Sequence, residues 1–143
     1  MEEIAEEFSV GGPSYRMFQY LREKGLTLHR PSDKAKKKIQ IAIERMGESL
    51  RLSAADKSVL ALAVDVESIT GKKAVILTDD YSIQNIASVL EICFQPISQT
   101  GITKTFKWIR RCRGCGRLLS HKETVCHICG STAKFVVDKK AKN

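Results

Sequence analysis

Four of the five cysteines in this 143-residue chain fall into two close pairs, and their spacing restricts the fold more than any other feature. Two residues separate the cysteines within each pair and ten residues separate the pairs, which comprise Cys112, Cys115, Cys126 and Cys129. Two residues between cysteines form a tight turn that points both thiolates at one ion, and two such turns complete a tetrahedral site. The pattern predicts a zinc ribbon around one structural zinc ion, whose binding supplies the folding free energy of this segment.

Other uses of these cysteines fit the sequence less well. The first ten residues carry four glutamates and no basic residue, which predicts no secretory signal and a reducing, cytoplasmic compartment where disulfides are rare. A redox motif needs one such pair rather than two at ribbon spacing. His121 and His127 are alternative ligands that could each replace a cysteine. No run of about 18 apolar residues is present, so no membrane span is expected.

Positive charge is concentrated in the cysteine-rich end of the chain. Residues 1–100 have a net charge of −1, whereas residues 101–143 contain 11 Lys and Arg against 2 Asp and Glu, a net charge of +9. Zinc-bound thiolates offset only part of this charge, and the remainder favours a polyanion, most often nucleic acid. The alternative, a solvated lysine tail, explains mainly the lysines after residue 138. Candidate phosphate contacts are Lys104, Lys107, Arg110, Arg111, Arg113 and Arg117.

Two aromatic residues, Phe106 and Trp108, interrupt this basic run. Either ring can stack on an unpaired base, which is how many proteins hold single-stranded nucleic acid. Packing at a domain junction explains Trp108 equally well, because large aromatic residues serve both purposes.

Helical periodicity and capping residues predict several helices in the first 100 residues. The first, over residues 1–9, is followed by helices expected to start at Ser14, at Ser32 or Asp33, and at Ser53, and to stop at Gly25, Gly47 and Gly71. Asp56 follows Ser53 by three residues, as in a capping box, and the apolar run after it predicts a central, buried helix. A fifth helix is expected over residues 81–90.

Short apolar runs between these helices predict strands over residues 26–28, 74–77 and 92–97. The run over 74–77 is bounded by polar residues on both sides, as is typical of a buried parallel strand. Strands that alternate with helices indicate an α/β layered fold with a parallel sheet. Cys93, between two apolar residues, is expected to be a buried core thiol.

Three acidic residues stand out in this first domain. Asp56 lies in the first turn of a helix, and Asp79 and Asp80 directly follow a strand. In an open α/β sheet, the carboxyl ends of strands and the adjacent helix starts line the crevice where ligands bind. Clustered carboxylates are held together by cations, and hard oxygen ligands suit Mg²⁺ or Mn²⁺. The alternative for each residue is a capping role only, at the start of its helix.

Several motifs together resemble a known family. Leu52-Ser53-Ala54-Ala55-Asp56 and Thr78-Asp79-Asp80-Tyr81, followed by Ile83-Gln84-Asn85, look like parts of a PIN-type nuclease domain. With a four-cysteine ribbon joined by a basic segment, the chain resembles the archaeal endoribonucleases that mature the 3′ end of small-subunit ribosomal RNA. The resemblance implies a PIN-like domain over residues 1–100, a basic linker over 101–111, and a zinc ribbon with a basic tail over 112–143.

The resemblance also implies individual roles and partners. Glu3, Asp56 and Asp80 match metal-site carboxylates, Asp79 a helper beside them, and the four cysteines the zinc ligands. The implied partners are precursor ribosomal RNA and the small ribosomal subunit, with Mg²⁺ or Mn²⁺ in the catalytic site. A PIN domain opens with a strand that ends in a metal-binding Asp, and no such strand precedes Glu3. The resemblance therefore predicts an N-terminally truncated chain without its first strand and first metal carboxylate.

Two functions besides metal-dependent RNA cleavage stay open at this point. A non-catalytic RNA- or ribosome-binding module fits the absence of the first strand. A zinc-ribbon transcription or translation factor with an unrelated α/β domain fits the ribbon and the charge, and then the three aspartates would only cap helices.

Overall fold

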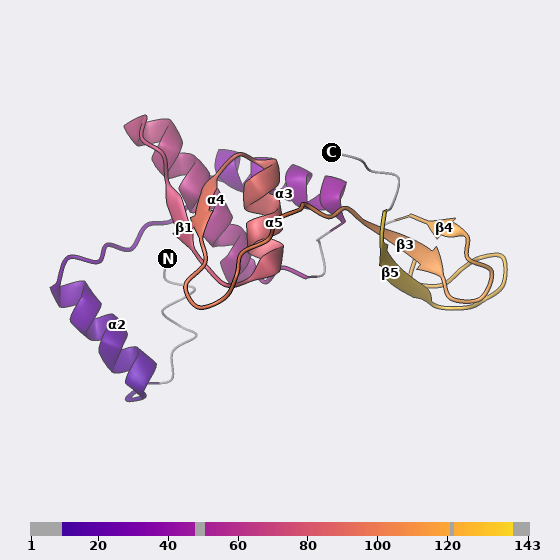
Figure 1. The fold of residues 1–143 in the computed structure, drawn as a ribbon, viewed down its shortest axis with the longest axis horizontal. Coiled ribbons are helices and arrows are strands. Elements are labelled where there is room, and N and C mark those ends of the chain that lie inside the picture. The colour runs from indigo at the N-terminus through magenta and orange to yellow at the C-terminus, as the bar shows by residue number, and fades with distance from the viewer. Residues whose placement is uncertain (1–9, 48–50, 121, 139–143) are drawn as a thin grey trace.

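The computed structural model describes residues 10–47, 51–120 and 122–138, and Figure 1 shows their arrangement. The expected helix over residues 1–9 lies outside the described residues. The described elements are α2 (Pro13–Glu23), α3 (Asp33–Met46), α4 (Ala54–Thr70), β1 (Val75–Leu77), α5 (Tyr81–Val89), β2 (Cys93–Gln95), β3 (Trp108–Cys112), β4 (Leu118–Leu119) and β5 (Ala133–Val137).

The first described helix, α2, begins earlier than the sequence predicts and buries none of its residues. Its N-cap is Gly12 rather than Ser14, because Pro13 opens the helix, where its fixed φ and missing N–H are tolerated. The helix ends at Glu23, close to the predicted stop at Gly25. Figure 1 shows α2 set apart from the other helices. The predicted strand over residues 26–28 is wrong, because no strand forms there.

The predicted caps of α3 and α4 are confirmed. The hydroxyl of Ser32 accepts a hydrogen bond from the backbone of Ala35, and Gly47 ends α3 with a positive φ. Ser53 and Asp56 form the capping box of α4: each side chain accepts a hydrogen bond from the other residue's backbone N–H, at 3.1 and 2.8 Å.

Gly47 also allows close contact between the two halves of the chain. A Cβ placed there would overlap the backbone oxygen of Trp108, at the start of β3. Only glycine combines this approach with a φ of +72°. The end of α3 therefore packs directly against the first residue of the C-terminal sheet.

A two-stranded parallel sheet and three helices form the main body of the molecule, which confirms the α/β class. Ile76 pairs with Phe94 in this sheet, α4 packs against β1, α5 against β2, and α3 against both helices. Ile76 faces the helices, whereas Val75 and Cys93 are exposed among the described residues. The prediction that Cys93 is buried is wrong, because alternation along the strand turns its neighbours Ile92 and Phe94 towards the helices instead.

The apolar core lies among α3, α4, α5 and β1. Ile39 and Ile43 of α3, Leu60 of α4 and Ile86 of α5 are all at most 1% exposed. The first turns of α4 are buried on most sides, whereas its last turn is exposed, since Ile69 there is 83% exposed. The prediction of a helix that is apolar on most sides is therefore correct, but its burial is less complete than predicted. Among the described helices, none is both long and apolar enough to cross a membrane.

Two isoleucines of α3 provide a matched test of this core. Ile43 is fully buried, whereas Ile41, two residues earlier on the same helix, is 51% exposed. We expect Ile43→Ala to lower the free energy of unfolding by about 2–5 kcal/mol, because it removes buried methyl groups and leaves a cavity. Urea denaturation followed by circular dichroism at 222 nm measures this change. We expect a loss below about 1 kcal/mol for Ile41→Ala, and equal losses for the two variants would contradict the described core.

Candidate functional site

The C-terminal sheet brings the two cysteine pairs together. Strand β3 lies between β4 and β5 and is antiparallel to both. Cys112 ends β3 and Cys115 lies in the turn after it, while the turn before β5 carries Cys126 and Cys129. Backbone hydrogen bonds close both turns, from Gly116 to Cys112 and from Gly130 to Cys126. Both glycines have positive φ.

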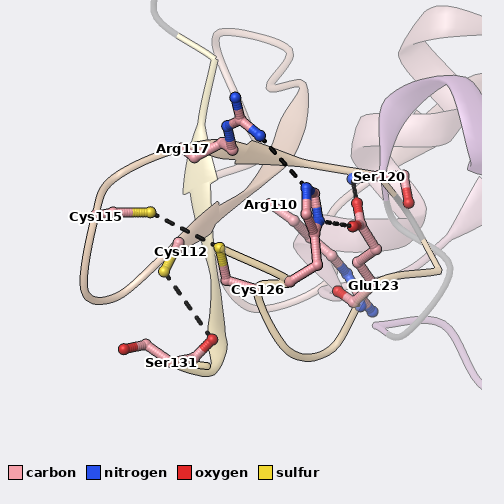
Figure 2. Close-up of polar contacts among 9 residues, drawn as sticks. Arg110, Cys112, Cys115, Arg117, Ser120, Glu123, Cys126 and Ser131 are labelled. Atoms are coloured by element: carbon pink, nitrogen blue, oxygen red, sulfur yellow. Dashed lines mark hydrogen bonds and ion pairs between the residues drawn. The ribbon is translucent and has the colours of Figure 1, made fainter. Parts of the chain in front are cut away.

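The four sulfur atoms form one compact cluster, in which all lie within 4.8 Å of one another. Cys115 Sγ lies 3.7 Å from Cys126 Sγ, and Cys112 Sγ lies 3.2 Å from Cys129 Sγ. The first distance is close to the ~3.8 Å that separates sulfurs around one ion with bonds of ~2.3 Å in tetrahedral geometry. Figure 2 shows three of these side chains pointing into one space between the turns. The four thiols can hold one metal ion, and soft thiolate donors of this number suit zinc.

Backbone N–H groups lie beside the sulfurs and favour the thiolate form of Cys126 and Cys129. Gly114 donates its N–H to Cys112 Sγ at 3.3 Å. Hydrogen bonds from Ser131, first from its backbone and then from its hydroxyl, lower the pKa of Cys129 to about 6. Backbone N–H groups of Cys129 and Ile128 lower the pKa of Cys126. These two cysteines are thus arranged as negatively charged ligands before any ion binds, whereas the neighbouring thiols, that of Cys112 first, outweigh the backbone N–H of Arg117 and raise the pKa of Cys115 to about 11.

Arg110 lies inside the ribbon rather than on its surface. It is 7% exposed, and its Nη1 donates a hydrogen bond of 2.9 Å to the backbone oxygen of Glu123. Its guanidinium lies over the ring of Phe135, 4.8 Å from the ring centre. These contacts give Arg110 a structural part in the ribbon, in contrast to the exposed cations Lys104, Lys107, Arg111, Arg113 and Arg117.

Glu123 lies between the two cysteine turns, and its side chain connects residues on either side of it. Its carboxylate accepts a hydrogen bond from the backbone of Ser120 at 2.7 Å (Figure 2) and contacts His127 Nδ1 at 3.0 Å. These two contacts, Ser120 first, lower the pKa of Glu123. Both ring nitrogens of His127 therefore have other partners, because its Nε2 lies 3.4 Å from Arg117 Nη1. The cluster consists of the four cysteines and does not include His127. His121, the other alternative ligand, lies outside the described residues.

Asp56 and Asp80 both stand at the start of a helix, Asp56 in the first turn of α4 and Asp80 at the N-cap of α5. Asp56 Oδ2 accepts the N–H of Ser53 in the α4 capping box. Asp80 is the N-cap of α5, and its Oδ1 accepts the N–H groups of Ser82 and Ile83 at 2.6 and 3.3 Å. In both residues the described hydrogen bonds fall on one oxygen, which leaves the other for a cation. The predicted capping roles are confirmed.

Asp79 has a different environment from its neighbour. Both of its oxygens accept hydrogen bonds from residues 97–99, including the Ser98 hydroxyl at 2.6 Å. The Ser98 hydroxyl, with the backbone N–H groups of this loop, lowers the pKa of Asp79 to about 2. Asp79 therefore fastens the loop after β2 to the carboxyl end of β1.

One side-chain contact links the loop before α4, which carries Asp56 in its first turn, to the start of α5, which carries Asp80 at its N-cap. Arg51, five residues before Asp56, lies with its Nε 3.4 Å from the hydroxyl of Ser82 in the first turn of α5. Within the described ranges, the four cysteines are the only group of three or more metal-ligating side chains close enough to share an ion. The structure thus brings the two helix starts towards one another without gathering three carboxylates. Glu3 lies outside the described residues.

Comparison with known proteins decides the family. No family model matches the chain. Endoribonuclease Nob1 of Archaeoglobus fulgidus is 38% identical over 124 residues, which span 87% of this chain and 73% of that protein. Endoribonuclease Nob1 of Methanothermobacter thermautotrophicus is 39% identical over 126 residues, which span 86% and 70%. The chain belongs to the Nob1 endoribonuclease family.

Membership in the Nob1 family confirms the resemblance inferred from the sequence motifs and the cysteine ribbon. A second kind of relative, ribonuclease VapC1 of Thermoplasma acidophilum, is 38% identical over 110 residues. That match covers 77% of this chain and 54% of the relative. Both sets of relatives are named ribonucleases.

In this Nob1-family chain, Gln84 and Asn85 have a structural part that was not predicted from the sequence. Both are almost fully buried in α5, and both hold the segment that leads to the ribbon. Gln84 bonds the backbone oxygen of Thr78 and the backbone N–H of Ile102, each at 2.9 Å. Asn85 bonds the backbone of Phe106 through both its amide atoms, each at 2.7 Å. Two amides on the otherwise apolar face of a helix were the available signal, since buried amides need partners.

Proposed function

We propose that this chain is a metal-dependent endoribonuclease that cleaves precursor small-subunit ribosomal RNA at its 3′ end. Four Nob1 relatives carry the name endoribonuclease, and the chain is 35–39% identical to them. The ribosomal RNA substrate and the small-subunit partner rest on the family resemblance of the PIN motifs and the ribbon.

The observation that carries the catalytic proposal is the shared edge at the starts of α4 and α5. Asp56 stands in the first turn of α4 and Asp80 at the N-cap of α5, where the positive end of the helix dipole favours a negatively charged side chain. The Arg51–Ser82 contact ties these two helix starts together. Two carboxylates placed in this way supply hard oxygen ligands for Mg²⁺ or Mn²⁺.

A bound divalent cation would supply Lewis-acid activation of a water for in-line attack on phosphorus and would neutralise the leaving 3′ oxygen. Asp56 and Asp80 would hold the cation, each through the oxygen that its helix cap does not use. Asp79 would act as a positioning residue, because its oxygens are engaged by residues 97–99. Glu3 remains in the proposal as a further carboxylate, on the family motif alone.

The ribbon would hold one zinc ion and bind the substrate. Its four thiols fit zinc in number and donor type, and the cytoplasm would keep them reduced. The exposed cations of residues 104–117 would contact phosphates, while the buried Arg110 would support the ribbon. In this division the domain over residues 1–100 cuts, and the linker over 101–111 and the ribbon over 112–143 hold the RNA.

Salt sensitivity tests the phosphate contacts. If about four cations contact phosphate, log K should fall with log salt at a slope of about −3, since each contact to a single strand contributes about −0.7. Fluorescence anisotropy of a labelled single-stranded RNA across a potassium chloride series measures the slope. The double variant Arg113→Ala/Arg117→Ala should flatten it by about 1.4. Lys72→Ala, at the opposite end of β1 from Asp80, should leave it unchanged, and a flat response of the unmodified chain would contradict the proposal.

The direct experiment is cleavage of a precursor ribosomal RNA fragment by the zinc-loaded chain with added Mn²⁺. The proposal predicts cut products with 5′-phosphate and 3′-hydroxyl ends, and no cutting without added divalent cation. Cleavage that is equally fast without any added cation would overturn the metal-dependent mechanism.

One observation favours a second candidate, a non-catalytic RNA-binding module. Within the described residues, no three carboxylates lie close enough to share an ion. This candidate predicts tight, salt-sensitive RNA binding and intact RNA at every Mn²⁺ concentration in the same experiment.

A further inference from the structure

A cavity of about 510 Å³ opens between α5 and the segment that leads to the ribbon. Three aromatic side chains line it, those of Tyr81, Phe106 and Trp108. Two cationic side chains, those of Arg51 and Lys104, stand at the same cavity. Its size lies within the usual range for small-molecule sites, about 300–1,000 Å³.

The wall of this cavity is held in place by the backbone contacts of buried side chains. Asn85 binds the N–H and the carbonyl of Phe106 at once, and Gln84 binds the N–H of Ile102. The hydroxyl of Tyr81 reaches the backbone oxygen of Thr100 at 3.4 Å. Because these bonds fix the backbone of residues 100–106, the ring of Phe106 is presented to the cavity without being needed to build it.

The chemistry of the walls combines aromatic faces with positive charge. The guanidinium of Arg51 lies over the ring of Trp108, 4.4 Å from its centre. Stacked aromatic rings beside cations are how proteins hold the bases and phosphates of single strands. The side-chain amide of Asn85 is engaged with Phe106, so it does not read base edges.

The place of the cavity relates it to the candidate carboxylates. Tyr81 directly follows Asp80, and Ser82, which also lines the cavity, donates its N–H to that carboxylate. Arg51 leads into the α4 cap that holds Asp56. A nucleotide in the cavity would therefore lie beside the edge where we place the cation.

We propose that this cavity takes one unpaired base of a single-stranded RNA, next to the phosphate that is cut. The inference rests on the proposed function in taking RNA as the ligand. Recognition is by stacking rather than by hydrogen bonds to base edges, so all bases bind and purines, with their larger rings, bind more tightly. A base-paired nucleotide does not enter, because its face is already stacked in a helix.

Trp108 is the only tryptophan of the chain and therefore reports on the cavity directly. We would titrate the zinc-loaded chain, without other divalent cations, with oligo(A), with oligo(A)–oligo(U) duplex and with inorganic polyphosphate. The expected result is saturable quenching of Trp108 fluorescence by oligo(A) only. Quenching of equal size by polyphosphate or duplex would show a purely ionic response and overturn the proposal.

Phe106 allows a second test that does not depend on fluorescence. Phe106→Ala should weaken oligo(A) binding about tenfold in anisotropy, the loss typical of one stacked base, and leave polyphosphate binding unchanged. Phe106→Tyr, which restores a ring, should recover the affinity, whereas Arg113→Ala should weaken both ligands alike. Unchanged oligo(A) affinity in Phe106→Ala would refute the base pocket. Because binding is measured without cleavage, the inference can stand when catalysis fails, and cleavage can stand when the pocket fails.

Discussion

Replacing Cys126 with serine should unfold the ribbon and leave the helical body intact. The buried core of the ribbon consists of Cys112, Leu119 and Cys126, with Ala133 packed against them. So small an apolar cluster cannot offset the conformational entropy of about 30 residues, so the metal must supply the stability. Zinc binding to zinc-finger peptides is worth about 10–16 kcal/mol near neutral pH, and the loss of one of four thiolates lowers this contribution.

Amide proton spectra of the zinc-loaded chain and the variant measure this effect. We expect the dispersed signals of β3, β4 and β5 to collapse in Cys126→Ser, while signals of α3, α4 and α5 stay in place. Cys93→Ser is the matched control, because Cys93 is exposed and far from the cluster in sequence. This variant should keep the signals of the ribbon, the signals of the helices and the zinc content unchanged. A folded, zinc-free ribbon in Cys126→Ser would contradict a metal-dependent fold.

The second large effect is expected from Asp80→Asn. Asparagine caps helices as well as aspartate does, so α5 should keep its start and the variant should fold normally. Only the negative charge is removed, and with it one ligand of the proposed cation. Losing such a ligand should slow cleavage by about 10²–10⁴-fold, which corresponds to several kcal/mol of transition-state stabilisation.

Single-turnover cleavage of the precursor RNA under saturating protein measures this rate. Asp33→Asn is a suitable control, since Asp33 also stands in the first turn of a helix, α3, and its side chain is highly exposed. The control should cut at the unmodified rate. A cleavage rate in Asp80→Asn equal to that of the control would remove Asp80 from the catalytic proposal.

Local features of the fold were predictable because they depend on a few neighbouring residues. Ser32 and Ser53 carry the side-chain oxygens that cap α3 and α4, and Gly47 and Gly71 can take the positive φ that ends them. The cysteine cluster was predictable for the same reason, because the spacing within each pair already defines a turn.

Features that depend on how distant segments pack were not predictable in this way. Cys93 lies in an apolar run, but which side of β2 meets the helices is decided by the whole sheet, and Cys93 is on the exposed side. Arg110 looks like its basic neighbours in sequence, yet the ring of Phe135 and the backbone of Glu123 enclose it. The hydrogen bonds from residues 97–99 to Asp79 also join two segments that are distant in sequence and meet only in the folded chain.

The most direct test is whether Asp56 and Asp80 share one divalent cation. Electron paramagnetic resonance of Mn²⁺ titrated into the zinc-loaded chain counts bound and free ion without any need for catalysis. We expect a saturable Mn²⁺ site that is weakened in Asp56→Asn and in Asp80→Asn alike, and is unchanged in Asp33→Asn. Equal Mn²⁺ binding by the unmodified chain and both variants would contradict a cation held between the starts of α4 and α5.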